Sequence, residues 1–453
     1  MAPGGDLPTY AGQIRVPGDD GVPGTVTLDE ATVILEADRL PARTLAYRDL
    51  AVLALSGGVG LIATGPGPGD ERWLLESFGA AAGPLIAALR ERRLRQRLAD
   101  GFVVLPEGEP VELVEYAIGR HGAGACCTTP QPGGGVAQLA VDGWGATLAP
   151  LDERQPARRY RRAEIEAVAL VPEVGGVQVT TAAGEFHLLR LGAAATRHRD
   201  RLAALPTAAQ RDAGAMVASL VPDLAPAAAG RAAAVLVDGR PASPADLGDA
   251  WDPIERGVLT EPTFAASYHA LRERAGGADA LRWLALAPER PGAPESPRAW
   301  FLVALPGNLV ALELVSEGAH ATYCFRMAPR AAFRGSADPA GIDQAAARQA
   351  VGRISTALVD ARFLREPIAL PDDELATPKG IRYRLALRAL PSLAAARAAF
   401  VARLVHRDGE SWGAALDDLI AWHAGCRDDA AVWPGRTTQE ALVAEAAAGG
   451  SAG

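Results

Sequence analysis

The feature that most constrains this chain is an internal repeat. The stretch Leu40–Leu55, LPARTLAYRDLAVLAL, recurs 115 residues later as Gln155–Leu170, QPARRYRRAEIEAVAL. Five of the sixteen aligned positions are identical, and three more are conservative. A repeated pattern indicates a repeated supersecondary unit, so we expect two copies of one module. The alternative is that two unrelated β-rich segments look alike because both need the same turns.

Short apolar or alternating segments around each copy predict strands, and each set ends in an amphipathic helix. In the first copy the strands are 25–28, 32–37, 44–55, 59–64 and 72–76, and the helix is 80–99. In the second copy they are 136–141, 147–150, the repeat itself, 176–181 and 185–191, followed by helices at 194–205 and 207–221. Gly79–Ala82 and Gly192–Ala195, both Gly-Ala-Ala-Ala, precede the two helices. The order of elements is therefore shared.

A β-meander that ends in one amphipathic helix within about 100 residues resembles pleckstrin-homology-like modules, in which two bent sheets are capped by a C-terminal helix. The resemblance covers residues 23–222 and is carried by element order. It implies an α+β chain with two tandem PH-like β-barrel or sandwich modules, and it implies recognition of lipids, peptides or proteins. The loops 28–32 and 141–145, where such modules often carry basic residues for lipid, are acidic here.

The remaining sequence predicts a third α+β region. Strands are expected at 281–286, 299–305, 309–316, 322–327 and 381–389, with helices at 341–363, 392–405 and 411–423. The predicted organisation is a flexible tail at 1–22, PH-like modules at 23–105 and 136–222 with a Gly/Pro-rich linker at 106–135 between them, a linker and helix at 223–280, a C-terminal domain at 281–425 and a tail at 426–453. Whether the C-terminal domain is a diverged third repeat or an unrelated domain stays open.

Charge and cysteine usage limit the class of protein. The 453-residue chain has a net charge of -9, which argues against a general nucleic-acid binder. The first twenty residues lack a basic segment followed by an apolar one, and no apolar run approaches the roughly 18 residues of a membrane span. The four cysteines form no C-x-x-C pair. These features favour a cytoplasmic protein with reduced thiols.

The clearest basic cluster is Arg158, Arg159, Arg161 and Arg162, interrupted by Tyr160. In a strand, Arg159 and Arg161 would lie on one face and the others on the opposite face. One interpretation is a site for an anion, an anionic lipid or a protein partner. The other is a solvated strand with local ion pairs, because acidic residues flank the run on both sides.

No other pattern predicts catalysis, a metal or a cofactor. His121 with Cys126 and Cys127 offers zinc-type ligands, but two adjacent cysteines rarely bind one metal and no further ligands follow at suitable spacing. Cys324 lies in an apolar strand and is expected to be buried. The phosphate-loop, nucleophile-elbow and zinc-protease motifs are missing from the sequence.

The sequence therefore favours a non-catalytic cytoplasmic scaffold that binds a protein partner or a second copy of itself. One alternative is an enzyme or small-ligand binder with a site in the C-terminal domain, around His320, Tyr323, Asp360 and Arg362. Another is association with a membrane surface through Arg158–Arg162.

Overall fold

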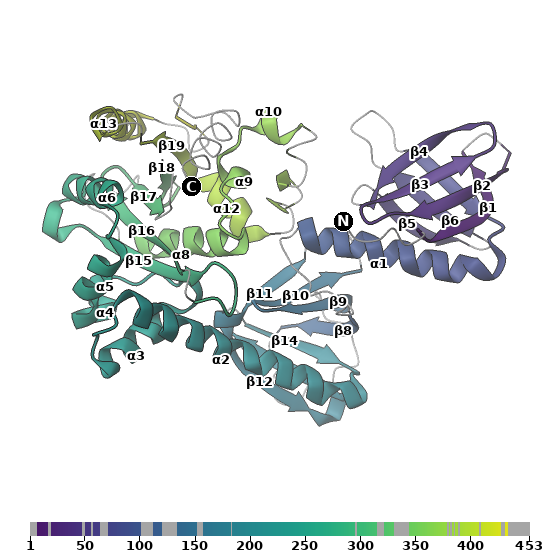
Figure 1. The fold of residues 1–453 in the computed structure, drawn as a ribbon, viewed down its shortest axis with the longest axis horizontal. Helices are drawn as coiled ribbons and strands as arrows, with labels where there is room; N and C mark the ends of the chain where they lie inside the picture. The colour runs from purple at the N-terminus through teal and green to yellow at the C-terminus, as the bar shows by residue number, and fades with distance from the viewer. Residues whose placement is uncertain are drawn as a thin grey trace. The chain divides into compact units, whose positions relative to one another are not determined.

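The computed structural model describes residues 7–16, 20–47, 50–55, 58–63, 71–100, 112–119, 134–151, 157–182, 184–294, 297–314, 321–329, 344–377, 380, 383–384, 386–387, 390–406, 409–426 and 431–433. The chain divides into two compact units, Met1–Gly101 and Phe102–Gly453, and each is described by itself. The predicted α+β class is confirmed: antiparallel sheets and helices make up both units (Figure 1).

Unit 1 is one seven-stranded antiparallel sheet followed by a helix. Its core places alternate strand residues, such as Val33 and Leu35, against Leu85 and Leu89 of the helix. The strand order is β4-β3-β2-β1-β7-β6-β5. The elements are β1 (Thr9–Arg15), β2 (Val22–Leu28), β3 (Thr32–Ala37), β4 (Leu40–Ala46), β5 (Leu50–Leu55), β6 (Gly58–Ala63), β7 (Glu71–Glu76) and α1 (Ala82–Asp100).

Unit 2 begins with a second seven-stranded sheet of the same design. Its order, β11-β10-β9-β8-β14-β13-β12, is that of unit 1 strand for strand. The elements are β8 (Glu112–Ile118), β9 (Gly135–Asp142), β10 (Gly145–Pro150), β11 (Arg158–Arg161), β12 (Ile165–Val171), β13 (Gly176–Thr181), β14 (Gly184–Leu189) and α2 (Ala195–Leu220).

The chain enters the two helices through the same backbone conformation. Ser77 and Gly79 have φ of 58° and 53°, and Arg190 and Gly192 have φ of 53° and 55°. A positive φ is costly for a residue with a Cβ, so its recurrence at Ser77 and Arg190 marks equivalent positions. Together with the strand order, this supports the predicted duplication.

Two predicted boundaries are wrong. β1 lies in the segment predicted as a tail, 1–22, and β8 lies in the predicted linker, 106–135. Each strand pairs with the second and with the last strand of its module, so one of its two partners lies at the far end of the module's sequence. Pairing of this kind leaves little local signal, which is why the sequence pattern did not show it.

The single strand predicted at 44–55, inside the repeat, is also wrong, because this stretch contributes to two strands, β4 and β5. β4 and β5 stand at opposite ends of the strand order, as do β11 and β12 in the second copy. The repeat therefore marks the two edges of each sheet. In the second copy, the chain crosses from one edge to the other through Arg162–Glu164.

The helix that follows the second sheet is shared by two cores. Sequence predicts separate helices on either side of Pro206, but α2 runs unbroken over 26 residues. Leu202 and Leu205 pack in the core of the second sheet, whereas Met216 and Val217 belong to the core of the following region. An interior proline costs a helix about 3 kcal/mol. Packing on both sides of Pro206 offsets this cost.

The rest of unit 2 is a five-stranded antiparallel sheet with helices on both faces (Figure 1). The strands, in sheet order, are β15 (Arg282–Pro288), β16 (Pro297–Leu305), β17 (Leu309–Leu314), β18 (Ala321–Arg326) and β19 (Phe400–Val405). The helices are α3 (Pro226–Val235), α4 (Pro244–Leu247), α5 (Trp251–Val258), α6 (Pro262–Arg274), α8 (Gln344–Asp360), α9 (Glu366–Ala369), α10 (Asp372–Leu375), α12 (Pro391–Ala399) and α13 (Gly409–Gly425).

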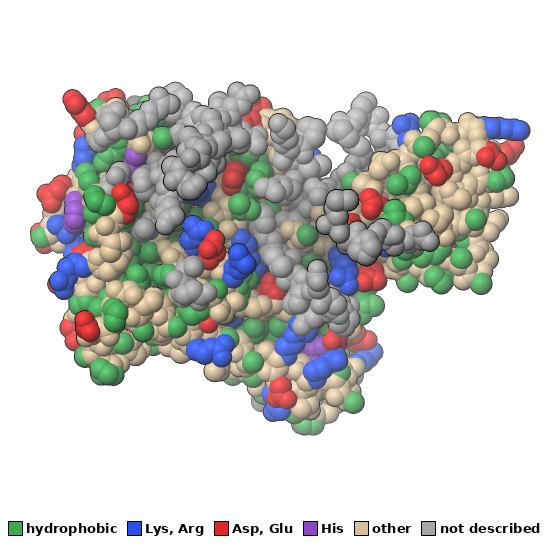
Figure 2. Space-filling model, in the orientation of Figure 1, with side chains coloured by type: hydrophobic (Ala, Val, Ile, Leu, Met, Phe, Trp, Pro, Cys, Tyr) green, Lys and Arg blue, Asp and Glu red, His purple; other side chains and the backbone are tan. Residues whose placement is uncertain are grey.

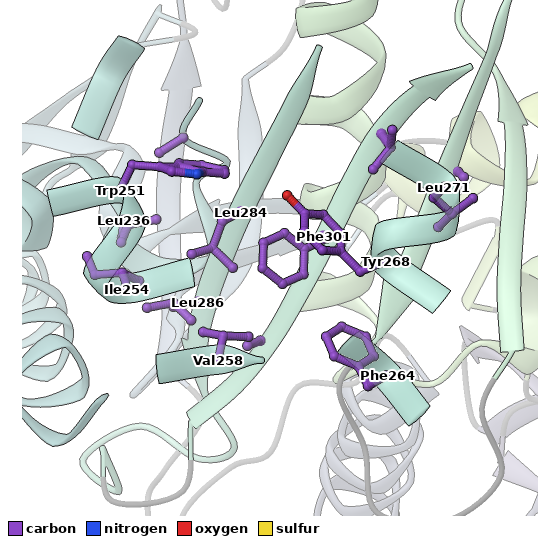
Figure 3. Close-up of a cluster of buried hydrophobic side chains, with 14 of the residues drawn as sticks. Leu236, Trp251, Ile254, Val258, Phe264, Tyr268, Leu271, Leu284, Leu286 and Phe301 are labelled. Atoms are coloured by element: carbon purple, nitrogen blue, oxygen red, sulfur yellow. The ribbon is translucent and has the colours of Figure 1, made fainter. Parts of the chain in front are cut away.

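Alternation along β16 divides this region into two cores. Phe301 and Val303 face α5, α6 and α13, whereas Trp300 and Leu302 face α8 and α12. Figure 3 shows the first core, where Tyr268 of α6 lies against Phe301 with ring centroids 4.1 Å apart. Strands buried on both faces read as continuous apolar runs, which explains why β15 to β18 were predicted.

Three predictions in this region differ from the structure. Residues 223–280, expected to be a linker and helix, form α3 to α6, whose apolar residues belong to the first core. The expected strand 381–389 has helical residues at 383–384 and 386–387. The expected helix 392–405 ends at Ala399, and Phe400–Val405 forms β19, which pairs with β18. The alanine-rich sequence before Phe400 favours a helix that continues past Ala399. Pairing with β18 instead makes residues 400–405 a strand.

Because α2 belongs to two cores, we expect Leu202→Ala to loosen both. The substitution should lower the free energy of unfolding of unit 2 by about 2–5 kcal/mol. In amide hydrogen exchange of the full chain, protection should fall equally in β13 and in β16. Exposed Arg211 on the same helix provides the control, and Arg211→Ala should leave both strands protected. Faster exchange confined to β8–β14 would contradict a shared cooperative unit.

Candidate functional site

The predicted basic cluster lies on β11, the edge strand of the second sheet. β11 pairs with β10 in the register Tyr160↔Ala146, and among the described residues no strand pairs with its other edge. Tyr160 points to the inner face of the sheet, where its ring stacks on Phe186 at 4.2 Å. Arg159 and Arg161 point to the opposite, outer face, as the alternation predicted. Arg162 leaves the strand and begins a 3-10 turn, Arg162–Glu164.

Arg162 is a buried ion-pair centre rather than a surface cation. Its side chain is 1% exposed and lies 2.7 Å from Asp212 on α2 and 3.2 Å from Asp238, which follows α3. Its guanidinium also lies over the ring of Trp144, 5.6 Å from the centroid. Asp212 accepts a further hydrogen bond from the backbone N–H of Gly292. Burial raises the pKa of Asp238, although the attraction of Arg162 opposes this shift.

A second ionic group surrounds Asp142 in the turn between β9 and β10. Its Oδ1 accepts the backbone N–H groups of Trp144 and Gly145. Its Oδ2 lies 3.1 Å from Arg362 and 3.5 Å from Arg159. Arg362 lies 4.3 Å from the centre of the Trp144 ring. Burial and then the nearby charge of Arg159 lower the pKa of Arg362 to about 9.

The structure therefore matches three of the four predicted arginines with carboxylates. Arg161 pairs with Glu164 at 2.9 Å, and the same carboxylate accepts the Arg161 backbone N–H. Arg158 is the exposed member. Side chains of both signs are also interspersed over the visible face of unit 2 (Figure 2). Whether the arginines bind an anion stays a prediction.

Two cavities flank β11, and Arg158 and Tyr160 line both. The inner cavity, of about 520 Å³, lies at the open side of the half-barrel between the two edge strands. It is lined by Ile118, Gly119, Arg158, Tyr160, Glu166, Thr180, Thr181, Ala182, Gly184 and Glu185. The outer cavity, of about 410 Å³, lies between β11, the end of α8 and the start of α12. It is lined by Ala157, Arg158, Arg159, Tyr160, Arg161, Glu164, Thr356, Asp360, Leu390, Pro391 and Ser392.

The described residues of the alternative site predicted in the C-terminal domain lie in three different surroundings. Asp360, which accepts a 2.5 Å hydrogen bond from Ser392, lines the outer cavity. Arg362 joins the Asp142 group. Tyr323 lies on β18, where its hydroxyl accepts a hydrogen bond from Arg403 at 3.1 Å. His320, His121, Cys126 and Cys127 lie outside the described residues.

A buried polar network on the five-stranded sheet was missed by sequence reasoning. Glu313 of β17 is 0% exposed, and Oε2 accepts a hydrogen bond from the Thr322 hydroxyl at 2.7 Å. The imidazole of His406 lies between this pair and Ser267. Its Nε2 is 2.7 Å from Thr322 Oγ1 and 3.3 Å from Glu313 Oε1. Its Nδ1 is 2.9 Å from Ser267 Oγ. Trp412 donates its indole N–H to Thr322. A lone Glu in the apolar strand LVALEL was the available signal.

This network contains Ser, His and Glu, but its setting is that of a core. Burial raises the pKa of Glu313 to about 8, and the hydrogen bond from Thr322 opposes the shift. None of its members lines either cavity. Cys324, on the strand beside Glu313, is fully buried as predicted, and burial raises the pKa of its thiol. A buried cysteine of this kind is unreactive.

Comparisons with known proteins give no family. The sequence matches no protein-family model and no curated protein. Within the described part of the chain, no three His, Cys, Asp or Glu side chains come together as a metal site would require. No helix in that part is long and apolar enough to span a membrane.

Removing Arg162 should be strongly destabilising, because it leaves Asp212 and Asp238 buried without their cation. We expect Arg162→Met to lower the free energy of unfolding by about 3–5 kcal/mol, measured by urea denaturation. Adding Asp212→Asn and Asp238→Asn removes the two unpaired buried charges and should recover part of the lost stability. Asn is a suitable replacement at Asp238 because it tolerates the positive φ of 51° there. Exposed Arg158→Met, the control, should change stability by less than about 0.5 kcal/mol. Equal effects at Arg158 and Arg162 would refute a buried ion-pair centre.

Glu313 should make stability fall as pH rises. Its pKa is about 8 in the folded chain against an ordinary 4.5, so between these values the folded state holds a proton that the unfolded state has lost. The free energy of unfolding should therefore decline by up to about 1.4 kcal/mol per pH unit over this window. Glu313→Gln removes the ionisation, and its stability relative to the unsubstituted chain should increase from pH 5 to pH 8. A difference in unfolding free energy between the two proteins that stays constant with pH would rule out a protonated Glu313. The control is Glu173→Gln at an exposed position, for which a constant difference is expected.

Proposed function

We propose that this protein is a non-catalytic interaction protein that binds a protein partner at β11. Each seven-stranded sheet with its helix is a pleckstrin-homology-like module, and the C-terminal domain holds the second module in place. The observation that carries the proposal is the position of β11: an edge strand with a cavity on each side, beside the boundary between the module and the C-terminal domain.

The fold supports a recognition role. Both modules have one strand order and one following helix, and this arrangement fits a pleckstrin-like half-barrel. Such folds are mostly used to bind peptides, proteins or lipids. Edge strands are natural places for another chain to approach, because a strand at the end of a sheet presents a row of main-chain groups outward.

The charges at β11 favour a protein partner over a membrane surface. Three arginines of the cluster, Arg159, Arg161 and Arg162, are neutralised by carboxylates. The carboxylates belong to Asp142, Glu164, Asp212 and Asp238, so the cluster presents little net positive charge. Membrane adsorption needs unmatched basic residues. Among the residues of the rival catalytic site, Arg362 binds Asp142 of the second module, and Asp360 accepts a hydrogen bond from Ser392 within the C-terminal domain.

Purification of the full chain from its native host, followed by mass spectrometry, tests this proposal. We expect a stoichiometric protein partner that is retained by Arg211→Trp, on an exposed part of α2, and lost with Ala182→Trp. Ala182 is exposed and lines the inner cavity, so the indole fills the cavity without changing its charge.

Two results would contradict the proposal. The first is a partner retained equally by both variants, which would place the binding surface elsewhere. The second is a co-purifying metabolite or metal ion in place of a protein, which would favour the enzyme or small-ligand alternative.

A further inference from the structure

We infer that the partner segment is an extended, basic polypeptide that runs along β11, with a Lys or Arg side chain in the inner cavity and a neighbouring apolar side chain in the outer cavity. This inference rests on the proposed function and names the chemistry of the partner at the same site.

The geometry of a strand relates the two cavities. Successive side chains of an extended chain point to opposite faces. The inner cavity lies on the face of β11 that carries Arg158 and Tyr160, and the outer cavity extends over the face that carries Arg159 and Arg161. A chain alongside β11 therefore directs one side chain into the inner cavity and the next into the outer cavity. A helical segment has no such two-sided alternation.

The inner cavity favours a positive charge. Glu166 and Glu185 line it, and within the described part of the chain neither forms an ion pair. Arg158 is the cation on the same lining, so the carboxylates are in excess. Tyr160 adds an aromatic wall beside which the methylene groups of a Lys or Arg side chain can pack. The net charge of -9 on the whole chain also attracts a basic segment at long range.

The outer cavity favours an apolar group. Two of its three arginines are already matched, Arg159 with Asp142 and Arg161 with Glu164, and the third, Arg158, also lines the inner cavity. Leu390 and Pro391 line its far side, beside Thr356 of α8. A side chain such as valine or leucine would cover Leu390 and Pro391 and leave both of these ion pairs intact. The partner segment should therefore carry a basic residue directly next to an apolar one.

The test uses three fluorescein-labelled peptides and the full chain in about 150 mM salt, where long-range attraction is screened beyond roughly 8 Å. The first peptide alternates valine and lysine over eight residues. The second has the same composition in two blocks, and the third alternates valine and glutamate. We expect fluorescence anisotropy to show binding of the first, at least about tenfold weaker binding of the second, and no binding of the third.

Substitutions locate the binding. The double variant Glu166→Gln/Glu185→Gln should weaken binding of the alternating lysine peptide by about tenfold or more. Glu173→Gln, on an exposed turn of the same module, removes one negative charge elsewhere and should not change it. Circular dichroism on each variant shows that the fold is retained. Equal affinity for the alternating and block peptides, or equal affinity of the double variant and Glu173→Gln, would overturn the inference.

Failure of this inference can be told apart from failure of the proposed function. If the peptides do not bind but the host partner is still lost with Ala182→Trp, the partner chemistry is wrong and the site stands. If the partner is also retained by Ala182→Trp, the site itself is wrong and both fall.

Discussion

The structure of unit 2 depends on the buried contact between Arg162 and the two aspartates Asp212 and Asp238. These residues come from the end of β11, from α2 and from the segment after α3, so one guanidinium ties the sheet edge to two parts of the helical layer. Removing one side of such a contact costs about 3–5 kcal/mol, a large share of the 5–15 kcal/mol that stabilises a typical domain. The position of β11 is therefore fixed by charge as well as by packing.

Helix α2 is the second feature that fixes the second module against the C-terminal domain. Its first half closes the half-barrel and its second half belongs to the core of the C-terminal domain, so the module and the domain share one rigid element. Trp144 and Arg362 add a stacked contact between the β9–β10 turn and the end of α8. If a partner binds at β11, little conformational entropy is lost there, because the strand is already ordered. This is a physical reason to place the interaction surface at β11 rather than in a loop.

Local patterns in the sequence predicted part of this structure. The repeat of Leu40–Leu55 at Gln155–Leu170 predicted the duplicated design, and continuous apolar runs predicted β15 to β18. Each of these signals is carried by a short stretch of consecutive residues. The cluster Arg158–Arg162 was found from composition alone. What the sequence could not show was its partners: Asp212 and Asp238 lie 50 and 76 residues beyond Arg162.

The errors share this cause. β1, β8 and β19 are strands because distant strands pair with them, and α2 continues through Pro206 because two cores pack against it. Glu313 lies 3.3 Å from His406, which belongs to the segment after β19. In each case the deciding interaction joins residues that are far apart along the chain, where hydrophobic period and turn chemistry carry no information.

The central claim is that a partner binds along β11. The most direct measurement is amide hydrogen exchange of the full chain, with and without the partner purified from its native host. Binding at β11 should slow exchange in residues 157–162 and in the lining of the inner cavity at 180–182 and 184–185. Unchanged exchange at β11, with protection confined to other parts of the chain, would contradict it.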